Sequence, residues 1–123
     1  MSLLDKKCIP CEGGTEPLKR EEIEKFKKEL KSKWRVIEEN SSKGRIKKIF
    51  QKFKFPDFKA ALAFVNEVGF LAEDESHHPD ILLSYGRVLI WLWTHAIEGL
   101  SENDFIMARK IEMLYNNYEE NIL

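Results

Sequence analysis

All three histidines of this chain fall within one short stretch, and their types and spacing could support acid/base chemistry. His77 and His78 are adjacent and are followed by Pro79, and His95 lies further along the same stretch. Histidine has an unperturbed pKa near neutrality, so it can accept and donate a proton within one catalytic cycle. Glu73 precedes the pair and could act as a fourth polar group.

Composition alone leaves three interpretations of these histidines open. The first is acid/base catalysis. The second is a three-histidine metal site, although the helical spacing of the H-E-x-x-H motif is missing. The third is a structural role at strand ends. The sequence shows no Ser/His/Asp arrangement, phosphate-binding glycine loop or dinucleotide fingerprint, so a nucleotide-dependent reaction has no support.

The elements that must position the histidines are two predicted strands that form a hairpin around Gly86. Symmetrical pairing about this glycine places residue 78 opposite residue 94, which brings His95 close to the adjacent histidines. Neighbouring residues of a strand point to opposite faces. We therefore expect an irregular backbone at Pro79, which would let both histidines face one site.

The hydrophobic periodicity of the whole chain predicts an α+β domain with one four-stranded antiparallel sheet and helices packed on one face, in the order α-β-β-α-β-β-α. The expected elements are a helix of about four turns starting at Pro17 with Thr15 as its cap, strands 34–38 and 45–55, a helix from Pro56-Asp57 onward, strands 80–85 and 87–94, and a helix capped by Ser101-Glu102-Asn103-Asp104. In the middle helix, the predicted apolar stripe is Phe58, Ala61, Leu62, Val65, Val68 and Leu71.

The last predicted strand is apolar on both faces. Val88 and Leu92 face one way, while Leu89, Trp91 and Trp93 face the other. An antiparallel sheet usually leaves one face polar. We therefore expect the second face to be covered by another subunit or to border a ligand pocket.

The chain has 123 residues, of which 43% are hydrophobic and 33% charged, a composition typical of a soluble globular protein. We expect an irregular lead-in at 1–16 and a single domain at 17–123. No apolar run approaches the roughly 20 residues that a membrane helix needs. The N-terminus also lacks the apolar core of a secretory signal, so we expect a cytoplasmic protein that makes no membrane contact.

Cys8 and Cys11 form a C-x-x-C motif without a second pair, and Pro10 with Gly13-Gly14 indicates a loop around them. A zinc site would need two further ligands from elsewhere in the chain. We expect a flexible tail with reduced thiols, and a redox or metal role remains an open alternative.

Charge is unevenly distributed along the chain. Residues 17–54 hold 14 Lys/Arg against 6 Asp/Glu, which could steer an anionic partner toward one end of the molecule. The solvated faces of a helix and a strand explain the same pattern. We do not favour nucleic-acid binding through Lys43–Lys54, which would require strongly salt-dependent affinity.

The histidines belong to a longer pattern, whose core is Glu73-x-x-x-His77-His78-Pro79, Tyr85-x-x-Val88, Leu92-x-Thr94-His95 and Gly99-Leu100-Ser101-x-x-Asp104. Upstream, Phe53-x-Phe55-x-Asp57-Phe58 extends it. From about residue 17 onward, this pattern resembles the pterin-4a-carbinolamine dehydratase family.

The resemblance implies dehydration of a 4a-hydroxytetrahydropterin to the quinonoid dihydropterin and water, in the recycling of tetrahydrobiopterin. It implies neither a metal nor an organic cofactor. By the same resemblance, His77 and His95 form the acid/base pair, His78 orients the pterin and Glu73 orients a histidine. The pattern leaves open which histidine is the acid, and which pterin is the substrate.

The resemblance also implies substrate contacts, and it has departures. Ser76 stands where the family commonly has Asp or Asn, and Ile81 stands where some members have Trp. Asp104 is typical of the family, but its capping role accounts for it, so we do not assign it to the site. The residues expected to bind the substrate are Ser76, Pro79, Thr94 and Trp93.

Family members assemble as dimers and tetramers, so the resemblance implies a homodimer or homotetramer. Some members also act as dimerisation cofactors of a transcription factor. The alternative function is therefore a non-catalytic protein that binds a pterin or regulates a transcription factor.

Overall fold

The computed structural model describes residues 2–10, 15–42 and 44–122, with side chains described as far as Tyr118. Within these residues, the predicted order of helices and strands is confirmed, apart from two short helical turns, one at the start and one before the last helix. The bounds, in chain order, are η1 (Leu3–Asp5), α1 (Arg20–Lys27), β1 (Arg35–Ser41), β2 (Gly44–Lys54), α2 (Phe58–Glu75), β3 (Asp80–Ser84), β4 (Arg87–Leu92), η2 (His95–Ile97) and α3 (Glu102–Ile122).

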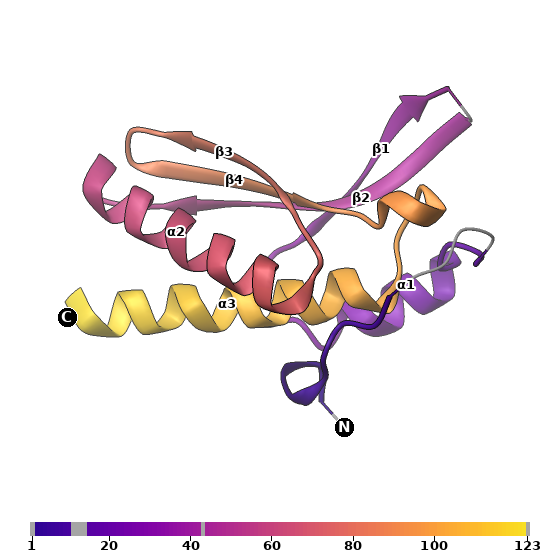
Figure 1. The fold of residues 1–123 in the computed structure, drawn as a ribbon, viewed down its shortest axis with the longest axis horizontal. Helices are drawn as coiled ribbons and strands as arrows, with labels where there is room; N and C mark the ends of the chain where they lie inside the picture. The colour runs from indigo at the N-terminus through magenta and orange to yellow at the C-terminus, as the bar shows by residue number, and fades with distance from the viewer. Residues whose placement is uncertain (1, 11–14, 43, 123) are drawn as a thin grey trace.

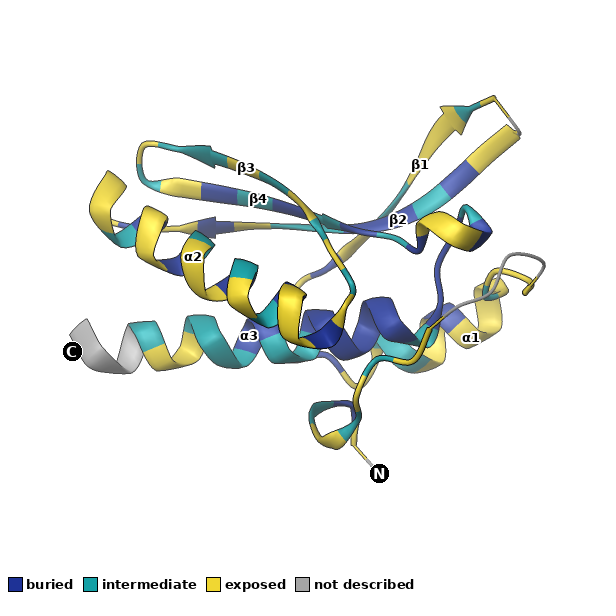
Figure 2. Ribbon diagram, in the orientation of Figure 1, coloured by how far each residue is buried: buried dark blue, intermediate teal, exposed yellow. Residues whose placement is uncertain are grey.

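The strands form one antiparallel sheet in the spatial order β1-β2-β4-β3. In Figure 1, α2 and α3 lie below one face of this sheet, and α1 lies beside the first turns of α3. The buried residues, dark blue in Figure 2, belong to the sheet and to the helices packed on it, and they form one hydrophobic core. The predicted α+β class is therefore confirmed. The core is built from Ile49, Phe53, Val88, Ile90 and Leu92 of the sheet and Phe64, Val68, Phe105 and Ile111 of the helices.

α2 starts where the sequence predicts and ends in an unusual conformation. The Asp57 side chain caps the helix by accepting the Ala60 N–H at 2.9 Å. After Glu75, Ser76 adopts a left-handed conformation with φ 53° and ψ 38°. This reversal ends the helix and starts the irregular backbone of residues 77–79, which the sequence predicted.

The apolar stripe predicted for α2 is partly wrong. Phe58 and Leu62 are 44% and 40% exposed, whereas Phe64 and Ala72, which the prediction omitted, are buried. The buried positions follow the line that faces the sheet and α3: Ala61, Phe64, Val68, Ala72 and Glu75. The prediction chose positions by apolar residue type alone. Because α2 carries more apolar residues than one face can bury, some of them stay exposed.

The first helix begins three residues later than predicted, and its predicted cap is wrong. Lys19, not Thr15, is the capping residue, and its backbone N–H donates to Glu22 Oε1 at 3.0 Å. The preceding backbone is engaged elsewhere, because the Leu18 N–H donates to the Leu100 carbonyl at 2.8 Å. This tertiary bond holds the chain extended where periodicity predicted a helical turn.

A buried carboxylate also ends α1 earlier than predicted. Glu112 of α3 is 3% exposed, and its oxygens accept the backbone N–H groups of Lys31 and Ser32 at 3.0 and 2.8 Å. The Trp34 indole N–H donates to the same carboxylate at 3.1 Å. Glu112 therefore fixes a turn between α1 and β1 that replaces the last predicted helical turns.

The hairpin of β3 and β4 forms around Gly86, but the predicted register is off by one residue. Ser84 pairs with Arg87, so Tyr85 and Gly86 together make a two-residue turn. Gly86 has φ 73°, and a Cβ at this position would lie 2.9 Å from the Phe55 carbonyl oxygen. The tight turn therefore requires glycine both for its backbone angle and for space.

The N-terminal residues pack against the domain, which contradicts the prediction of a flexible tail around Cys8. Leu3 of η1 is 2% exposed and belongs to the core. Cys8 is half-buried and is a free thiol, while Cys11 lies outside the described residues. The predicted boundary at residue 17 stays a prediction.

Two further features concern the outer surface of the described chain. Leu89, Trp91 and Trp93 are half-buried on the sheet face away from the helices, and the predicted cover over that face stays a prediction. No helix within the described residues is both long enough and apolar enough to cross a membrane.

Candidate active site

A cleft of about 310 Å³ lies where the end of α2, the end of β4 and the start of α3 meet. All three histidines line it, as the hairpin pairing predicted. The N-terminal segment contributes to one side. The lining residues are Ile9, Pro10, Ser76, His77, His78, Trp93, Thr94, His95, Ala96 and Asn103.

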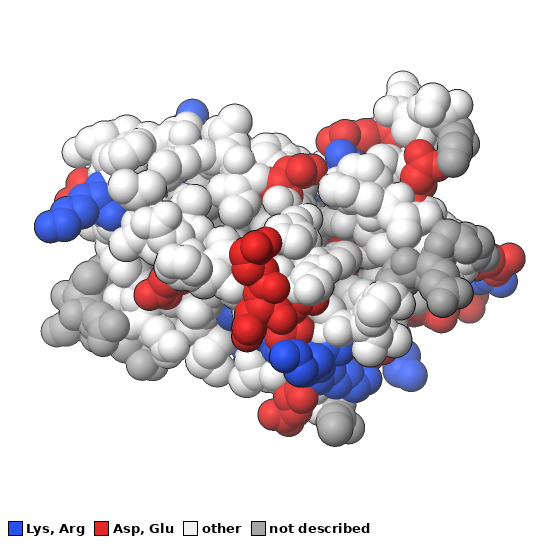
Figure 3. Space-filling model, viewed as in Figure 1, with Lys and Arg blue, Asp and Glu red and all other residues white. Residues whose placement is uncertain are grey.

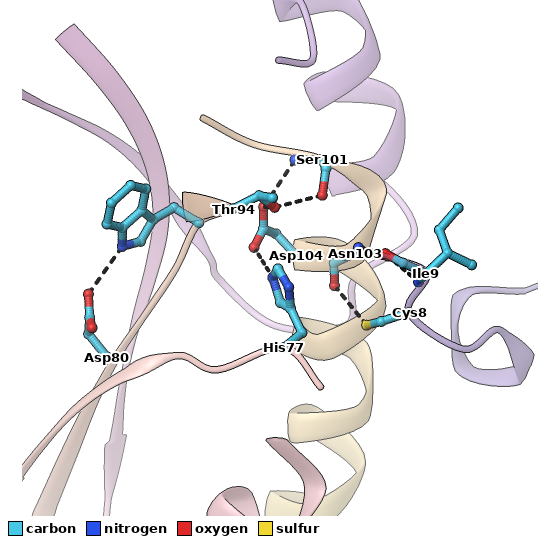
Figure 4. A network of polar contacts seen from close by, with 9 residues as sticks. Cys8, Ile9, His77, Asp80, Thr94, Ser101, Asn103 and Asp104 are labelled. Carbon is cyan, nitrogen blue, oxygen red and sulfur yellow. Dashed lines mark hydrogen bonds and ion pairs between the residues drawn. The ribbon is translucent and has the colours of Figure 1, made fainter. Parts of the chain in front are cut away.

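His77 is held by a carboxylate at the base of the cleft (Figure 4). Its Nε2 lies 2.7 Å from Oδ1 of Asp104, whose side chain is fully buried, and the His77 side chain is 11% exposed. An ionised carboxylate can only accept a hydrogen bond. With Asp104 ionised, Nε2 therefore carries the proton, and Nδ1 presents a lone pair. Within the described residues, no protein group bonds Nδ1.

The second oxygen of Asp104 is fixed by the loop and helix that flank it. Oδ2 accepts the Thr94 hydroxyl at 2.8 Å and the Ser101 backbone N–H at 3.0 Å. The hydroxyls of Thr94 and Ser101 lie 2.7 Å apart. Because the single Thr94 hydroxyl proton goes to Asp104, Ser101 must donate to Thr94. This chain of donors orients Asp104, and the positive end of α3 favours its charge.

His95 stands at the rim of the cleft because a closed loop presents it there. The Thr94 N–H donates to the Gly99 carbonyl at 2.8 Å, which closes the loop, and Glu98 turns it with φ 50°. A Cβ at Gly99 would lie 2.6 Å from the Cβ of Pro17. The loop is therefore packed against the chain that leads into α1, and the exposed His95 side chain projects from a fixed backbone.

Trp93 forms an aromatic wall next to His95, and polar contacts fix its position. The two ring centroids are 4.0 Å apart with planes at 40°. The indole N–H donates to Asp80 at 3.1 Å (Figure 4). Lys48 places its ammonium 4.7 Å from the Trp93 ring centroid and pairs with Glu39 at 2.8 Å. These contacts restrain the surface on which His95 rests.

His78 and Glu73 form a second histidine–carboxylate pair, located on the surface. Oε2 of Glu73 contacts Nε2 of His78, and the two side chains are 76% and 58% exposed, respectively. Glu73 therefore touches a histidine, and its predicted role in orienting that histidine stays a prediction. The pair borders the cleft only through His78.

The cleft brings together most of the predicted site residues. His77, His78, His95, Ser76, Thr94 and Trp93 line it, whereas Pro79 and Glu73 do not. Within the described residues, no group of three His, Cys, Asp or Glu side chains is arranged to hold a metal ion. The carboxylate contacts of His77 and His78 instead suit proton transfer and ligand binding.

Sequence reasoning missed the most deeply buried polar group of the site. The capping motif accounts for only one oxygen of Asp104: this oxygen caps α3, while the other oxygen holds His77. The spacing Ser101-x-x-Asp104 carried the capping signal, and no local pattern pointed to His77. Asn103, Ile9 and Pro10 were missed as well, because only the fold brings them to the cleft.

The chain is similar in sequence to proteins of one family. The sequence pattern of the family described as "Pterin 4 alpha carbinolamine dehydratase" matches residues 16–114. A Rickettsia bellii protein named "Putative pterin-4-alpha-carbinolamine dehydratase" is 48% identical over 94% of this chain and 96% of its own length. A protein of the same name from Alkaliphilus metalliredigens is 47% identical over 90% of this chain and 94% of its own length.

Solved structures show the same fold. The crystal structure of a Brucella melitensis protein titled "transcriptional coactivator/pterin dehydratase" covers 80% of this chain and 98% of its own, with a TM-score of 0.70 and 30% identity. A pterin dehydratase-like RuBisCO assembly factor of the alpha-carboxysome superposes with a TM-score of 0.56 at 22% identity, which bears on the fold alone. From its sequence matches and its fold, this chain belongs to the pterin-4-alpha-carbinolamine dehydratase family.

Proposed function

We propose that this protein dehydrates a 4a-hydroxytetrahydropterin to the quinonoid dihydropterin by histidine acid/base catalysis. The observation that carries the proposal is the meeting of three histidines in one cleft, with one of them bonded to a fully buried carboxylate. Membership of the dehydratase family supports the same reaction.

The reaction needs two proton transfers and no change of oxidation state. A base removes the proton from the ring nitrogen N5, and the N–H electron pair forms the C4a=N5 double bond. The C4a–O bond breaks as an acid protonates the 4a-hydroxyl, which leaves as water. Two positioned histidines can supply both steps, so the proposed chemistry uses neither a metal nor an organic cofactor.

The contacts of His77 suit it to the role of base. Its Nε2–H donates to Asp104, so Nδ1 is the nitrogen that can accept a proton. The imidazolium formed by that transfer would lie beside the Asp104 carboxylate, which stabilises the positive charge. We therefore propose that His77 accepts the N5 proton and that His95, which lines the same cleft, protonates the leaving hydroxyl.

The other predicted residues would bind and orient the pterin. His78 and Ser76 offer hydrogen-bonding groups on one side of the cleft, and the Trp93 ring offers an aromatic surface. Thr94 acts indirectly, because its hydroxyl is committed to Asp104. Glu73 orients His78, and Pro79 shapes the link between α2 and β3 without lining the cleft.

The biological setting that we propose is the recycling of tetrahydrobiopterin in the cytoplasm, in a homodimer or homotetramer. The oligomer is supported by exposed apolar side chains on α2, β3 and the turn after β3: Phe58, Leu62, Phe70, Leu82 and Tyr85. Figure 3 shows few charged atoms over this part of the surface. Exposed apolar surface of this kind is typical of protein interfaces. Multi-angle light scattering would measure the assembly directly.

The proposed function is tested by stopped-flow dehydration of freshly generated 4a-hydroxytetrahydropterin. The wild type should accelerate the reaction above the uncatalysed rate, and His77→Ala and His95→Ala should each lose about 10²–10⁴-fold in rate. Circular dichroism would confirm that both variants are folded. A wild-type rate equal to background would refute the enzyme and leave the alternative, a protein that binds a pterin or a partner without turnover.

A further inference from the structure

We propose that Ile9 and Pro10 of the N-terminal segment form a fixed wall of the cleft and contact the substrate, with Asn103 and Glu75 as the positioning residues that hold this wall. The inference rests on the proposed function, because it assigns further binding residues to the same site. The family match begins at residue 16, so this wall lies outside the matched region.

Ile9 and Pro10 line the cleft that holds the three histidines. Ile9 is 70% exposed, although the backbone on which it stands is firmly bonded. When an exposed apolar side chain at a cleft mouth covers the face of a flat ring, both surfaces are removed from water. This burial stabilises the bound ligand. Together with Trp93 and Ala96, Ile9 gives the cleft the apolar lining that ligand sites commonly have.

Asn103 anchors the segment by a two-point contact (Figure 4). The Ile9 N–H donates to Asn103 Oδ1 at 3.0 Å, and the Asn103 amide donates in turn to the Ile9 carbonyl. Asn103 is 4% exposed and lies in the first turn of α3. One side chain therefore satisfies both polar groups of the Ile9 backbone, as a neighbouring strand would.

Glu75 anchors the segment one residue earlier. Its Oε1 accepts the Cys8 N–H at 2.8 Å, and its Oε2 pairs with Lys110 at 2.7 Å. Glu75 is 7% exposed. Although burial alone would raise the pKa of Glu75, the hydrogen bonds from Lys110 and the Cys8 amide, and the charge of Lys110, hold it below its usual value. The carboxylate therefore stays ionised and bonded at neutral pH.

Both anchors are adjacent in sequence to residues of the reacting centre. Glu75 precedes Ser76 and His77, and Asn103 precedes Asp104. One chain segment carries Glu75 and His77, and the other carries Asn103 and Asp104. These two segments therefore also hold the backbone of residues 8 and 9. The wall and the proposed base are built on one support, so the position of Ile9 relative to His77 is fixed.

The wall is tested first by Ile9→Ala, with Lys7→Ala as the matched control. Lys7 is exposed on the same segment and does not line the cleft. A contact made equally to the substrate and to the transition state affects KM and leaves kcat unchanged. Ile9→Ala should raise KM about tenfold with kcat within about twofold, because apolar contact is lost. Lys7→Ala should change neither.

The anchors are tested without turnover, by the reactivity of Cys8. Burial, reinforced by the charge of Glu75 and a hydrogen bond to it, raises the pKa of the Cys8 thiol to about 12. Its thiolate, which is the reactive form, is therefore scarce near pH 8. Alkylation of Cys8 by iodoacetamide should be slow in the wild type. Tandem mass spectrometry would identify the alkylated cysteine. Asn103→Ala should release the segment and speed alkylation at Cys8 at least tenfold, while Lys7→Ala should not.

The outcomes separate this inference from the proposed function. If the wild type turns over and Ile9→Ala keeps its KM, the wall is refuted and the enzyme stands. If the wild type shows no turnover, fluorescence titration with a stable dihydropterin decides: weaker binding by Ile9→Ala alone supports the wall, and equal binding or no binding overturns it. Equal alkylation of Cys8 in the wild type and Asn103→Ala would refute the anchoring.

Discussion

Two adjacent histidines in this protein have opposite surroundings. His77 bonds Asp104, and the side chains of this pair are 11% and 0% exposed. His78 contacts Glu73, and the side chains of this pair are 58% and 76% exposed. Both are histidine–carboxylate pairs, but within the described residues only the Asp104 carboxylate accepts further hydrogen bonds that fix its position.

The difference shows that burial, and further hydrogen bonds to the carboxylate, decide what such a pair can do, since the residue types are similar in both pairs. An exposed ion pair is screened by water and holds its side chains loosely. A buried and fully bonded carboxylate has one orientation and acts at low dielectric. We therefore expect Asp104 to determine how His77 reacts, and Glu73 to influence only how His78 meets its ligand.

The largest effect should come from Asp104→Asn. The amide would present its NH₂ group to His77, which would force the ring proton onto Nδ1 and remove the lone pair from the cleft. A comparable tautomer error in a hydrolase triad costs about 10⁴-fold, and we expect kcat to fall at least 10²-fold. Stopped-flow rates would measure it, and Glu73→Gln, as the exposed counterpart, should stay within about threefold. Equal losses in both variants would contradict the comparison.

A smaller effect should follow from Thr94→Val, which keeps the shape of the side chain and removes its hydroxyl. Asp104 would lose one donor, and Ser101 would lose its acceptor inside the protein. Unsatisfied buried polar groups cost about 1–3 kcal/mol, so we expect the free energy of unfolding to fall by about that amount. Urea denaturation would measure it. The same substitution at the exposed Thr15 is the control, and an equal change there would argue against the network.

The smallest effect concerns Glu75, the second buried carboxylate near the site, and it depends on pH. Its pKa in the folded protein lies below the ordinary value of 4.5, so its contribution to stability is present above about pH 4.5 and is lost as pH falls through the folded pKa. The difference in unfolding free energy between wild type and Glu75→Gln should therefore shrink in acid. Denaturation curves from pH 7 to pH 3 would measure it, with Glu67→Gln on the exposed side of α2 as control. A constant difference would contradict the assignment.

Local signals were enough to predict much of the fold. The start of the helix at Pro56-Asp57 and the turn at Gly86 are encoded within a few residues. The helix begins where predicted, and the turn forms at Gly86 with its register shifted by one residue. The start of α1 could not be predicted in this way, because the bond between Leu18 and Leu100 joins residues far apart in sequence. The same holds for the turn that Glu112 fixes after α1.

The site was predictable to the extent that its residues lie close together in sequence. His77, His78 and His95 share one hairpin, so pairing brought them together even with the register off by one residue. Asp104 lies in the next helix, and its capping motif gave a sufficient local explanation. Ile9 lies far away at the other end of the chain. Only tertiary packing reveals that Asp104 bonds His77 and that Ile9 lines the cleft.

The docked N-terminus has a practical consequence for handling this protein. An affinity tag or fluorophore fused ahead of Ser2 would be attached to the docked segment that lines the cleft, seven residues before Ile9. The far end of α3 is safer: the helix starts at the cleft, and its 21 residues carry the chain about 30 Å away (Figure 1). Labels for assays and immobilisation therefore belong at the C-terminus.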